Sequence, residues 1–155
     1  MRRPYVFTRN RVENHKMPRY VPKTVREYGR IYLAERLAEH GWQCFIARRS
    51  PNEDEVIAGR PEQGREIRLK FHSQEHRQAV RFYDLAGLDW NWEYLVISTY
   101  ILDETPVTYL LSQDDVRAKG RLEEEFNGSA IGGWLQPDAF SEKAFREAWH
   151  KLDGR

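Results

Sequence analysis

Apolar and charged positions alternate between residues 53 and 72 in a way that is typical of two short β-strands. Residues 67–71 alternate strictly, residues 56–58 are a β-type run, and the segment 59–64 between them begins and ends with glycine, which predicts a turn. Side chains on a strand point alternately to its two faces. The pattern therefore predicts a hairpin that buries one row of side chains and leaves a charged row on the other face: Ile67, Leu69 and Phe71 inside, Glu66, Arg68 and Lys70 outside.

Three helices are predicted from apolar spacing. Residues 24–27 (TVRE) have the spacing of a capping box, and the helix that begins there is expected to end near His40, with Gly41 just past its end. Its apolar stripe consists of Val25, Gly29, Leu33 and Leu37. Apolar side chains at helical spacing also predict a helix over 74–88 and another over 141–152.

Further strands are predicted at 42–47, 93–102 and 107–111, with a turn at 103–106. Ser112 is expected to cap a short helix, whereas 121–133 looks irregular and its Gly132-Gly133 pair predicts a turn. The predicted order is helix, three strands, helix, two strands, helix. This order favours an α/β fold with a mixed sheet flanked by helices, in a single domain over residues 24–155.

Charge is distributed unevenly along the 155 residues. The chain carries a formal net charge of +1, but residues 1–30 hold nine Lys or Arg against two Glu, a local charge of +7 that leaves −6 for the rest. A basic arm over residues 1–23, with tyrosines and a phenylalanine, is typical of a phosphate-contacting tail. A solvated tail, or one docked on an acidic patch, is the alternative. The basic residues considered for nucleic-acid contact are Arg2, Arg3, Arg9, Arg11 and Lys16.

Cysteine usage and hydropathy limit the environment. Cys44, the single cysteine, lies in an apolar run, which indicates a buried thiol and a reducing compartment. No stretch approaches the roughly 20 apolar residues of a membrane span, and the N-terminal region lacks the apolar core of a signal peptide. We therefore expect a cytoplasmic protein without membrane contact.

Two other patterns carry weaker functional interpretations. Residues 72–76 match H-x-x-E-H, in which two histidines one helical turn apart bind zinc, but His72 continues the strand pattern, so exposed histidines at a strand end are favoured. Trp90 and Trp92 could stack on bases or form a protein interface, although core and rim positions are the commoner use of such indoles.

Several short runs together resemble the PD-(D/E)XK, or restriction-endonuclease-like, nuclease superfamily, in particular its small Holliday-junction-resolvase-like members. The runs are 29–37, 41–42, 55–58, 67–70 and 94–97. The resemblance implies a restriction-endonuclease-like sandwich, built on a mixed four- or five-stranded sheet flanked by helices. It also implies hydrolysis of phosphodiester bonds with Mg²⁺, in which carboxylates hold the cation and a lysine acts at the scissile phosphate.

The same resemblance assigns residues to that chemistry. The acid of the family's first strand corresponds to Glu55, or to Asp54 if the alignment is shifted by one residue. The family's lysine corresponds to Lys70. Two positions depart from the family pattern, because Arg68 stands where an acid or amide is expected and Arg30 where many relatives carry a helix acid. A guanidinium has no lone pair to offer a cation. Glu66 could supply the missing oxygen, so the implied metal ligands are Asp54, Glu55 and Glu66.

These residues lead to three functional hypotheses. The first is a nucleic-acid-binding, nuclease-like domain, with DNA as ligand and impaired or absent catalysis, in which Arg30, Arg68 and Lys70 form one phosphate-binding pocket. The second is an active Mg²⁺-dependent endonuclease that uses Glu55, Glu66 and Lys70. The third is a non-catalytic subunit that binds a protein partner or forms a homodimer.

Overall fold

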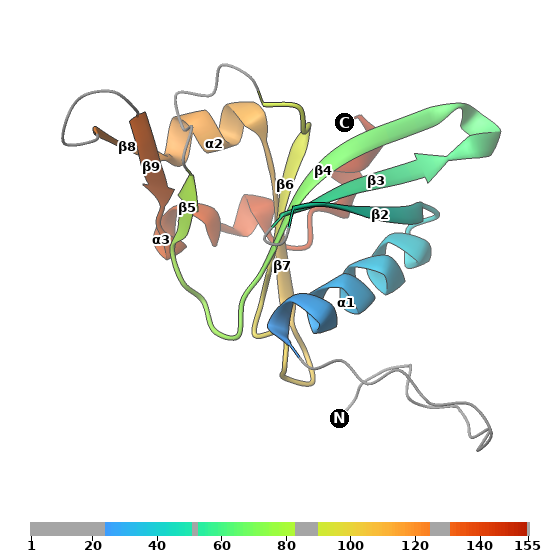
Figure 1. Ribbon diagram of the computed structural model, residues 1–155, viewed down its shortest axis with the longest axis horizontal. Coiled ribbons are helices and arrows are strands. Elements are labelled where there is room, and N and C mark those ends of the chain that lie inside the picture. The colour runs from blue at the N-terminus through green and yellow to red at the C-terminus, as the bar shows by residue number, and fades with distance from the viewer. Residues whose placement is uncertain (1–23, 51–52, 83–89, 125–130, 155) are drawn as a thin grey trace.

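A five-stranded mixed sheet forms the centre of the protein in the computed structural model, which describes residues 24–50, 53–82, 90–124 and 131–154. The strand order is β2-β3-β4-β6-β7, and β4 and β6 are parallel while the other neighbours are antiparallel. This arrangement confirms the predicted α/β class with a mixed sheet (Figure 1). The strand bounds are Gln43–Ser50 for β2, Glu53–Arg60 for β3, Arg65–Ser73 for β4, Tyr94–Thr99 for β6 and Val107–Ser112 for β7.

Helix α1 (Val25–Glu39) and the C-terminal 3-10 turn η3 (Trp149–Asp153) cover one face of the sheet. The threonine half of the predicted capping box is confirmed, because the Thr24 hydroxyl accepts a hydrogen bond from the backbone N–H of Glu27 over 3.1 Å. The helix approaches β4 closely at Gly29, where an added Cβ would lie 2.5 Å from the Ser73 side chain. The core on this face includes Leu33, Leu37, Val56, Ile67, Leu69, Val96, Leu110, Trp149 and Leu152.

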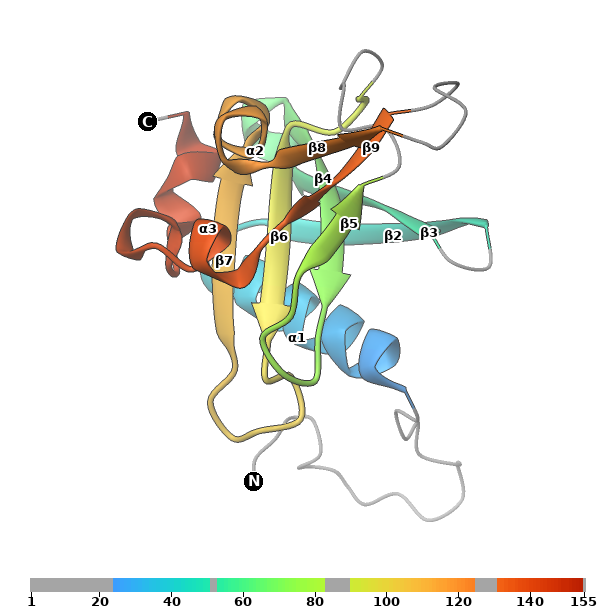
Figure 2. The ribbon, with the colours of Figure 1, turned by 90° about the vertical axis from the view of Figure 1, so that its left-hand side faces the viewer.

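A second layer packs on the opposite face of the sheet, against β6 and β7. It contains α2 (Gln113–Lys119), α3 (Pro137–Phe140) and a small sheet of order β5-β9-β8, with bounds Val80–Phe82, Ile131–Leu135 and Arg121–Glu124 (Figure 2). Ser112 caps α2 as predicted, in a capping box with Asp115. The core on this face includes Val80, Trp92, Leu95, Ile97, Tyr109, Leu111, Val116, Leu135, Phe140 and Phe145.

The predicted helix over 74–88 is wrong for the part of it that the structure describes. Gln74 is buried, and its side-chain amide both donates to the Gln78 carbonyl over 2.7 Å and accepts from the Gln78 N–H over 3.0 Å. These two bonds close residues 74–78 into a loop, after which Val80 enters β5 and pairs with Leu135. A buried amide and a long-range strand partner override the helical spacing.

The predicted helix over 141–152 is also wrong. The segment contains two 3-10 turns, η2 (Lys143–Phe145) and η3, separated by Glu147 at a positive φ of 47°. Between the turns, Arg146 forms an isolated antiparallel bridge with Tyr109 on β7. The segment thus caps the outer edge of the sheet, and its apolar residues Phe145, Ala148, Trp149 and Leu152 are still buried.

The region 121–133 is more regular than predicted, because it contains β8 and the first three residues of β9. Gly132 and Gly133 form part of β9, not a turn, and both are buried. Gly133 pairs with Phe82 on one side and Leu122 on the other. In the described part of the chain no helix is long and apolar enough to cross a membrane.

Candidate nucleic-acid interface

The hairpin predicted from the alternating pattern is present. Strands β3 and β4 are antiparallel, with Ile57 opposite Arg68, and are joined by the short turn η1 (Pro61–Gln63) and by Gly64 in the left-handed conformation at φ 64°. Ile67 and Leu69 are buried, whereas Glu66 and Arg68 are exposed and Lys70 is half-buried. The alternation therefore placed the apolar and the charged row correctly.

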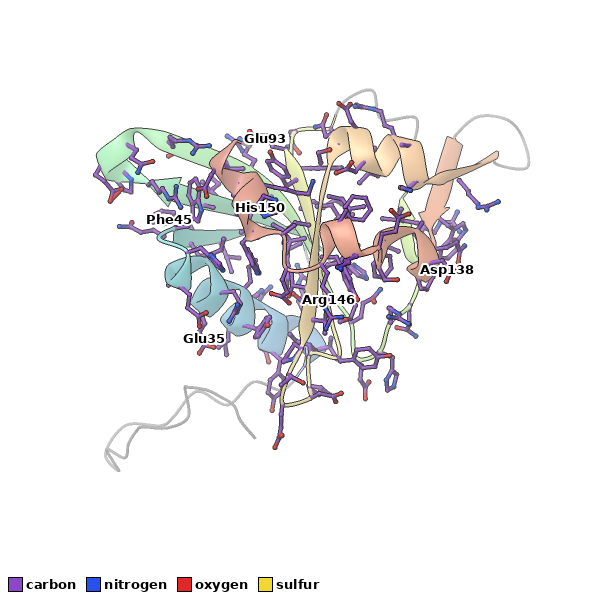
Figure 3. The ribbon with its side chains drawn as sticks, turned by 180° about the vertical axis from the view of Figure 1, so that it is seen from behind. Glu35, Phe45, Glu93, Asp138, Arg146 and His150 are labelled. Atoms are coloured by element: carbon purple, nitrogen blue, oxygen red, sulfur yellow. The ribbon has the colours of Figure 1, made fainter. Side chains whose placement is uncertain are left out.

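The charged row belongs to a broader exposed surface on three strands. In β2, Phe45 pairs with Ile57, so Phe45, Ile57 and Arg68 form one row across the strands. We call the surface formed by Phe45, Ile57, Glu66, Arg68 and Lys70 the open face. Phe45 and Asp138, which belongs to α3 of the second layer, lie toward opposite ends of the molecule (Figure 3). The Phe45 side chain is 53% exposed.

Two other arginines of the hairpin hold the C-terminal segment. The Arg60 guanidinium lies 3.9 Å from the centre of the Trp42 ring and forms an ion pair with Asp153 over 2.7 Å. Arg65 donates to the Leu152 carbonyl over 3.0 Å. A cation over an indole and a part-buried ion pair both stabilise the fold. These two arginines therefore have structural roles.

The backbone of β3 places the implied catalytic acid near the implied lysine. Val56 pairs with Leu69. Because the strands are antiparallel, Glu55, which precedes Val56, lies opposite Lys70, which follows Leu69. Their Cα atoms are thus neighbours, about 5 Å apart. The side chains of residues 47–55, which include Asp54 and Glu55, lie outside the described part of the structure, so the structure gives only their place on the strand.

Glu66 is not brought to the same place. It pairs with Gly59, four residues along β4 from Lys70, and at about 3.3 Å per residue the two Cα atoms are separated by roughly 13 Å. Mg²⁺ ligands lie about 2.1 Å from the metal, so Glu66 does not share a cation with a group beside Lys70. Among the described side chains, no cluster of three His, Cys, Asp or Glu could hold a metal ion.

Arg30 does not join Arg68 and Lys70 in one pocket, which corrects the expectation from the sequence. Helix α1 contacts β4 through Gly29, whose nearest neighbours are Ser73 and Phe71. Those side chains point to the face opposite Arg68 and Lys70, because successive residues of a strand alternate. The sheet therefore separates Arg30 from the open face. The basic residues of the arm (Arg2, Arg3, Arg9, Arg11 and Lys16) lie outside the described residues.

Glu93 is a neighbour of Arg68 that the sequence did not single out. Its carboxylate accepts from the Arg68 backbone N–H over 3.1 Å, and its own N–H donates to the Arg68 carbonyl over 2.8 Å. Figure 3 shows Glu93 at the start of β6. This contact depends on the parallel pairing of β4 with β6, which no local pattern reports.

His72 follows Lys70 on the same face of β4. Burial first, and the nearby Lys70 charge second, lower the pKa of the His72 imidazole below its usual 6.5. His72 lies in a strand and His76 in an irregular segment, so the zinc pattern lacks the helix that it requires. Trp90 and Trp92 stack on each other at 4.6 Å, and Trp92 belongs to the core, which confirms their structural role.

No family model matches the chain, and neither a curated protein nor a solved structure matches it. The resemblance to PD-(D/E)XK nucleases therefore stays a prediction.

Proposed function

We propose that this protein is a nucleic-acid-binding, nuclease-like domain that holds DNA phosphates with Arg68 and Lys70, assisted by the basic arm, and that its catalysis is impaired or absent. The observation that carries the proposal is the placement of these two cations. They are two residues apart on one face of β4, about 6.6 Å along the strand, and their neighbours Ile67 and Leu69 are buried on the other face.

The chemistry of the two side chains suits phosphate. A guanidinium matches two phosphate oxygens with a planar pair of donors, and an ammonium adds a compact positive charge. Because the strand is paired on both sides, with β3 and with β6, the backbone that carries both cations is fixed. A fixed backbone reduces the entropy lost when a ligand binds.

Loss of catalysis follows from the donor set beside Lys70. Arg68 stands at the position where the resemblance implies an oxygen ligand, and it brings positive charge in place of a lone pair. Glu66, the proposed substitute, is too far along the strand to complete a cation site there. The site beside Lys70 therefore has too few carboxylate ligands, and too much positive charge, to bind a divalent cation well.

An active Mg²⁺-dependent endonuclease is the second candidate. One observation favours it, namely the neighbouring positions of Glu55 and Lys70 on paired strands. In that case Glu55 would hold the metal, which lowers the pKa of a bound water, and Lys70 would stabilise charge on the scissile phosphate.

A salt titration with labelled DNA tests the leading proposal. We expect the full chain to bind, with an affinity that falls steeply between about 50 and 200 mM salt. A full-length variant with Arg2, Arg3, Arg9, Arg11 and Lys16 changed to Gln should bind more weakly and with a shallower salt dependence. Absence of binding at low salt would overturn the proposal.

A cleavage assay separates the two candidates. Branched, single-stranded and duplex DNA are incubated with the full chain and Mg²⁺ or Mn²⁺. The leading proposal predicts intact DNA in every reaction. Metal-dependent cleavage that disappears in a Lys70→Ala variant would instead establish the endonuclease.

A further inference from the structure

We infer that the Phe45 ring is a stacking platform, and that the open face therefore binds single-stranded nucleic acid in preference to duplex. This inference rests on the proposed function and specifies its ligand. Among the described residues, Phe45 is the one Phe, Tyr or Trp whose side chain is exposed, at 53%. A large exposed ring within a strand, on the same face as two cations, offers a base a surface for stacking.

The Phe45 ring lies next to Gly59 of the neighbouring strand β3. If Gly59 carried a Cβ, that atom would lie 3.5 Å from Cε2 of Phe45. Gly59 is buried in a strand and its φ is not positive, so its backbone conformation does not require glycine. One edge of the ring is therefore within contact distance of β3 at Gly59, and about half of the residue surface stays exposed to a ligand.

The cations of the open face lie beside this platform. Ile57 separates Phe45 from Arg68 in one row, which places them two strand spacings, or about 10 Å, apart. Lys70 lies two residues beyond Arg68 on β4, about 6.6 Å further along the strand. A base on Phe45 thus leaves its backbone within reach of Arg68 and Lys70. Glu66 is also on this face and would repel phosphates from the hairpin end, which directs the backbone toward the two cations.

Stacking discriminates between single strands and duplexes. In a duplex the two faces of each base are covered by neighbouring base pairs, whereas an extended single strand offers an open face at any base. Arg68 and Lys70 alone would bind the phosphates of either form. A preference for the single strand therefore depends on Phe45.

Fluorescence anisotropy with the full chain tests this inference. The probes are an oligothymidylate, an oligouridylate and a DNA duplex, and the variants are Phe45→Ala, Phe45→Tyr and Leu102→Ala. Leu102 is the matched control, because it is a large exposed apolar side chain, at 46%, in the turn after β6.

We expect the wild type to bind single strands more tightly than duplex. Phe45→Ala should lower single-strand affinity about tenfold and leave duplex affinity nearly unchanged, since one stacked base is lost. Phe45→Tyr should retain the affinity, and Leu102→Ala should have no effect. The two single-stranded probes distinguish DNA from RNA.

Each other outcome overturns a defined part of the account. If the protein binds DNA and Phe45→Ala changes nothing, or weakens both forms equally, the platform is overturned while the proposed function stands. If the wild type binds no probe, both fail. If Phe45→Ala converts a dimer into a monomer with unchanged DNA affinity, the open face is a contact between two copies, and the inference is wrong. Unchanged duplex affinity of the Phe45→Ala variant excludes misfolding as the cause of its lower single-strand affinity.

Discussion

Thr108 and Glu147 exchange two hydrogen bonds. The Glu147 N–H donates to the Thr108 carbonyl over 2.7 Å, and the Thr108 N–H donates to the Glu147 carboxylate over 2.8 Å. The same carboxylate also accepts from the Trp149 indole N–H over 2.9 Å. Glu147, a residue at a positive φ, thus satisfies the backbone groups of Thr108 at the outer edge of β7, where unpaired strand groups would otherwise be available for aggregation.

Removal of this carboxylate should destabilise the protein. Glu147→Ala leaves the Thr108 and Trp149 donors without their acceptor, for an expected loss of about 1–3 kcal/mol in the free energy of unfolding. Glu147→Gln keeps one acceptor oxygen and should lose less. Urea denaturation measures both. Glu142→Ala is the control, since that carboxylate forms a more exposed ion pair with Lys119, and equal losses in the two alanine variants would contradict the account.

The close approach of α1 to β4 predicts that Gly29→Ala is destabilising. Alanine favours helix by about 1 kcal/mol over glycine, but the new methyl would lie 2.5 Å from Ser73 and 2.9 Å from Phe71. Overpacking of this kind costs about 1–3 kcal/mol, so the clash should outweigh the helix gain. Thermal unfolding should show a lower midpoint. A raised midpoint would mean that α1 does not pack against β4 at Gly29.

The lowered pKa of His72 predicts a specific acid sensitivity. The unfolded chain binds a proton at His72 near pH 6.5, before the folded protein does, so the contribution of His72 to stability is complete above that pH and declines below it. Urea denaturation of the wild type and of His72→Gln at pH 7 and pH 5 isolates the effect. The wild type should lose more stability than the variant. An identical loss would show that His72 is not held neutral.

Cys44 is predicted to be an unreactive thiol in the folded protein. Burial raises its pKa to about 11, which at pH 8 leaves far less thiolate than an ordinary cysteine with a pKa near 8.5. Iodoacetamide labelling followed by mass spectrometry should therefore be at least about tenfold slower in native protein than in urea. Comparable labelling rates would contradict the partial burial of this side chain.

The sequence predicted those parts of the fold that local patterns determine. The capped helix α1, the alternating hairpin and the capping Ser112 all depend on residues within one turn or one strand. The errors fall where a distant partner decides the conformation. Val80 pairs with Leu135, so part of the segment 74–88 forms strand β5 in place of a helix. Arg146 bridges to Tyr109, so the segment 141–152 packs along the edge of the sheet in place of a helix.

The candidate site was predictable to the same extent. Alternation placed Arg68 and Lys70 on the exposed face of β4. Alternation does not indicate which face of the sheet α1 covers. Arg30 of α1 was therefore grouped with Arg68 and Lys70, although the sheet lies between Arg30 and these two residues. The row from Phe45 to Arg68 and the contact of Glu93 with Arg68 depend on strand register, which becomes known only in the folded sheet.

The central claim is that Arg68 and Lys70 bind the phosphates. Two double variants of equal charge test it: Arg68→Gln with Lys70→Gln on the open face, and Lys143→Gln with Arg146→Gln at exposed positions of the C-terminal segment. The measurement is the slope of log Kd against log salt for a single-stranded oligonucleotide. The account predicts that the first pair weakens binding and reduces the slope by up to about 1.4, at roughly 0.7 per lost contact, while the second pair leaves both unchanged. Equal effects of the two pairs would contradict it.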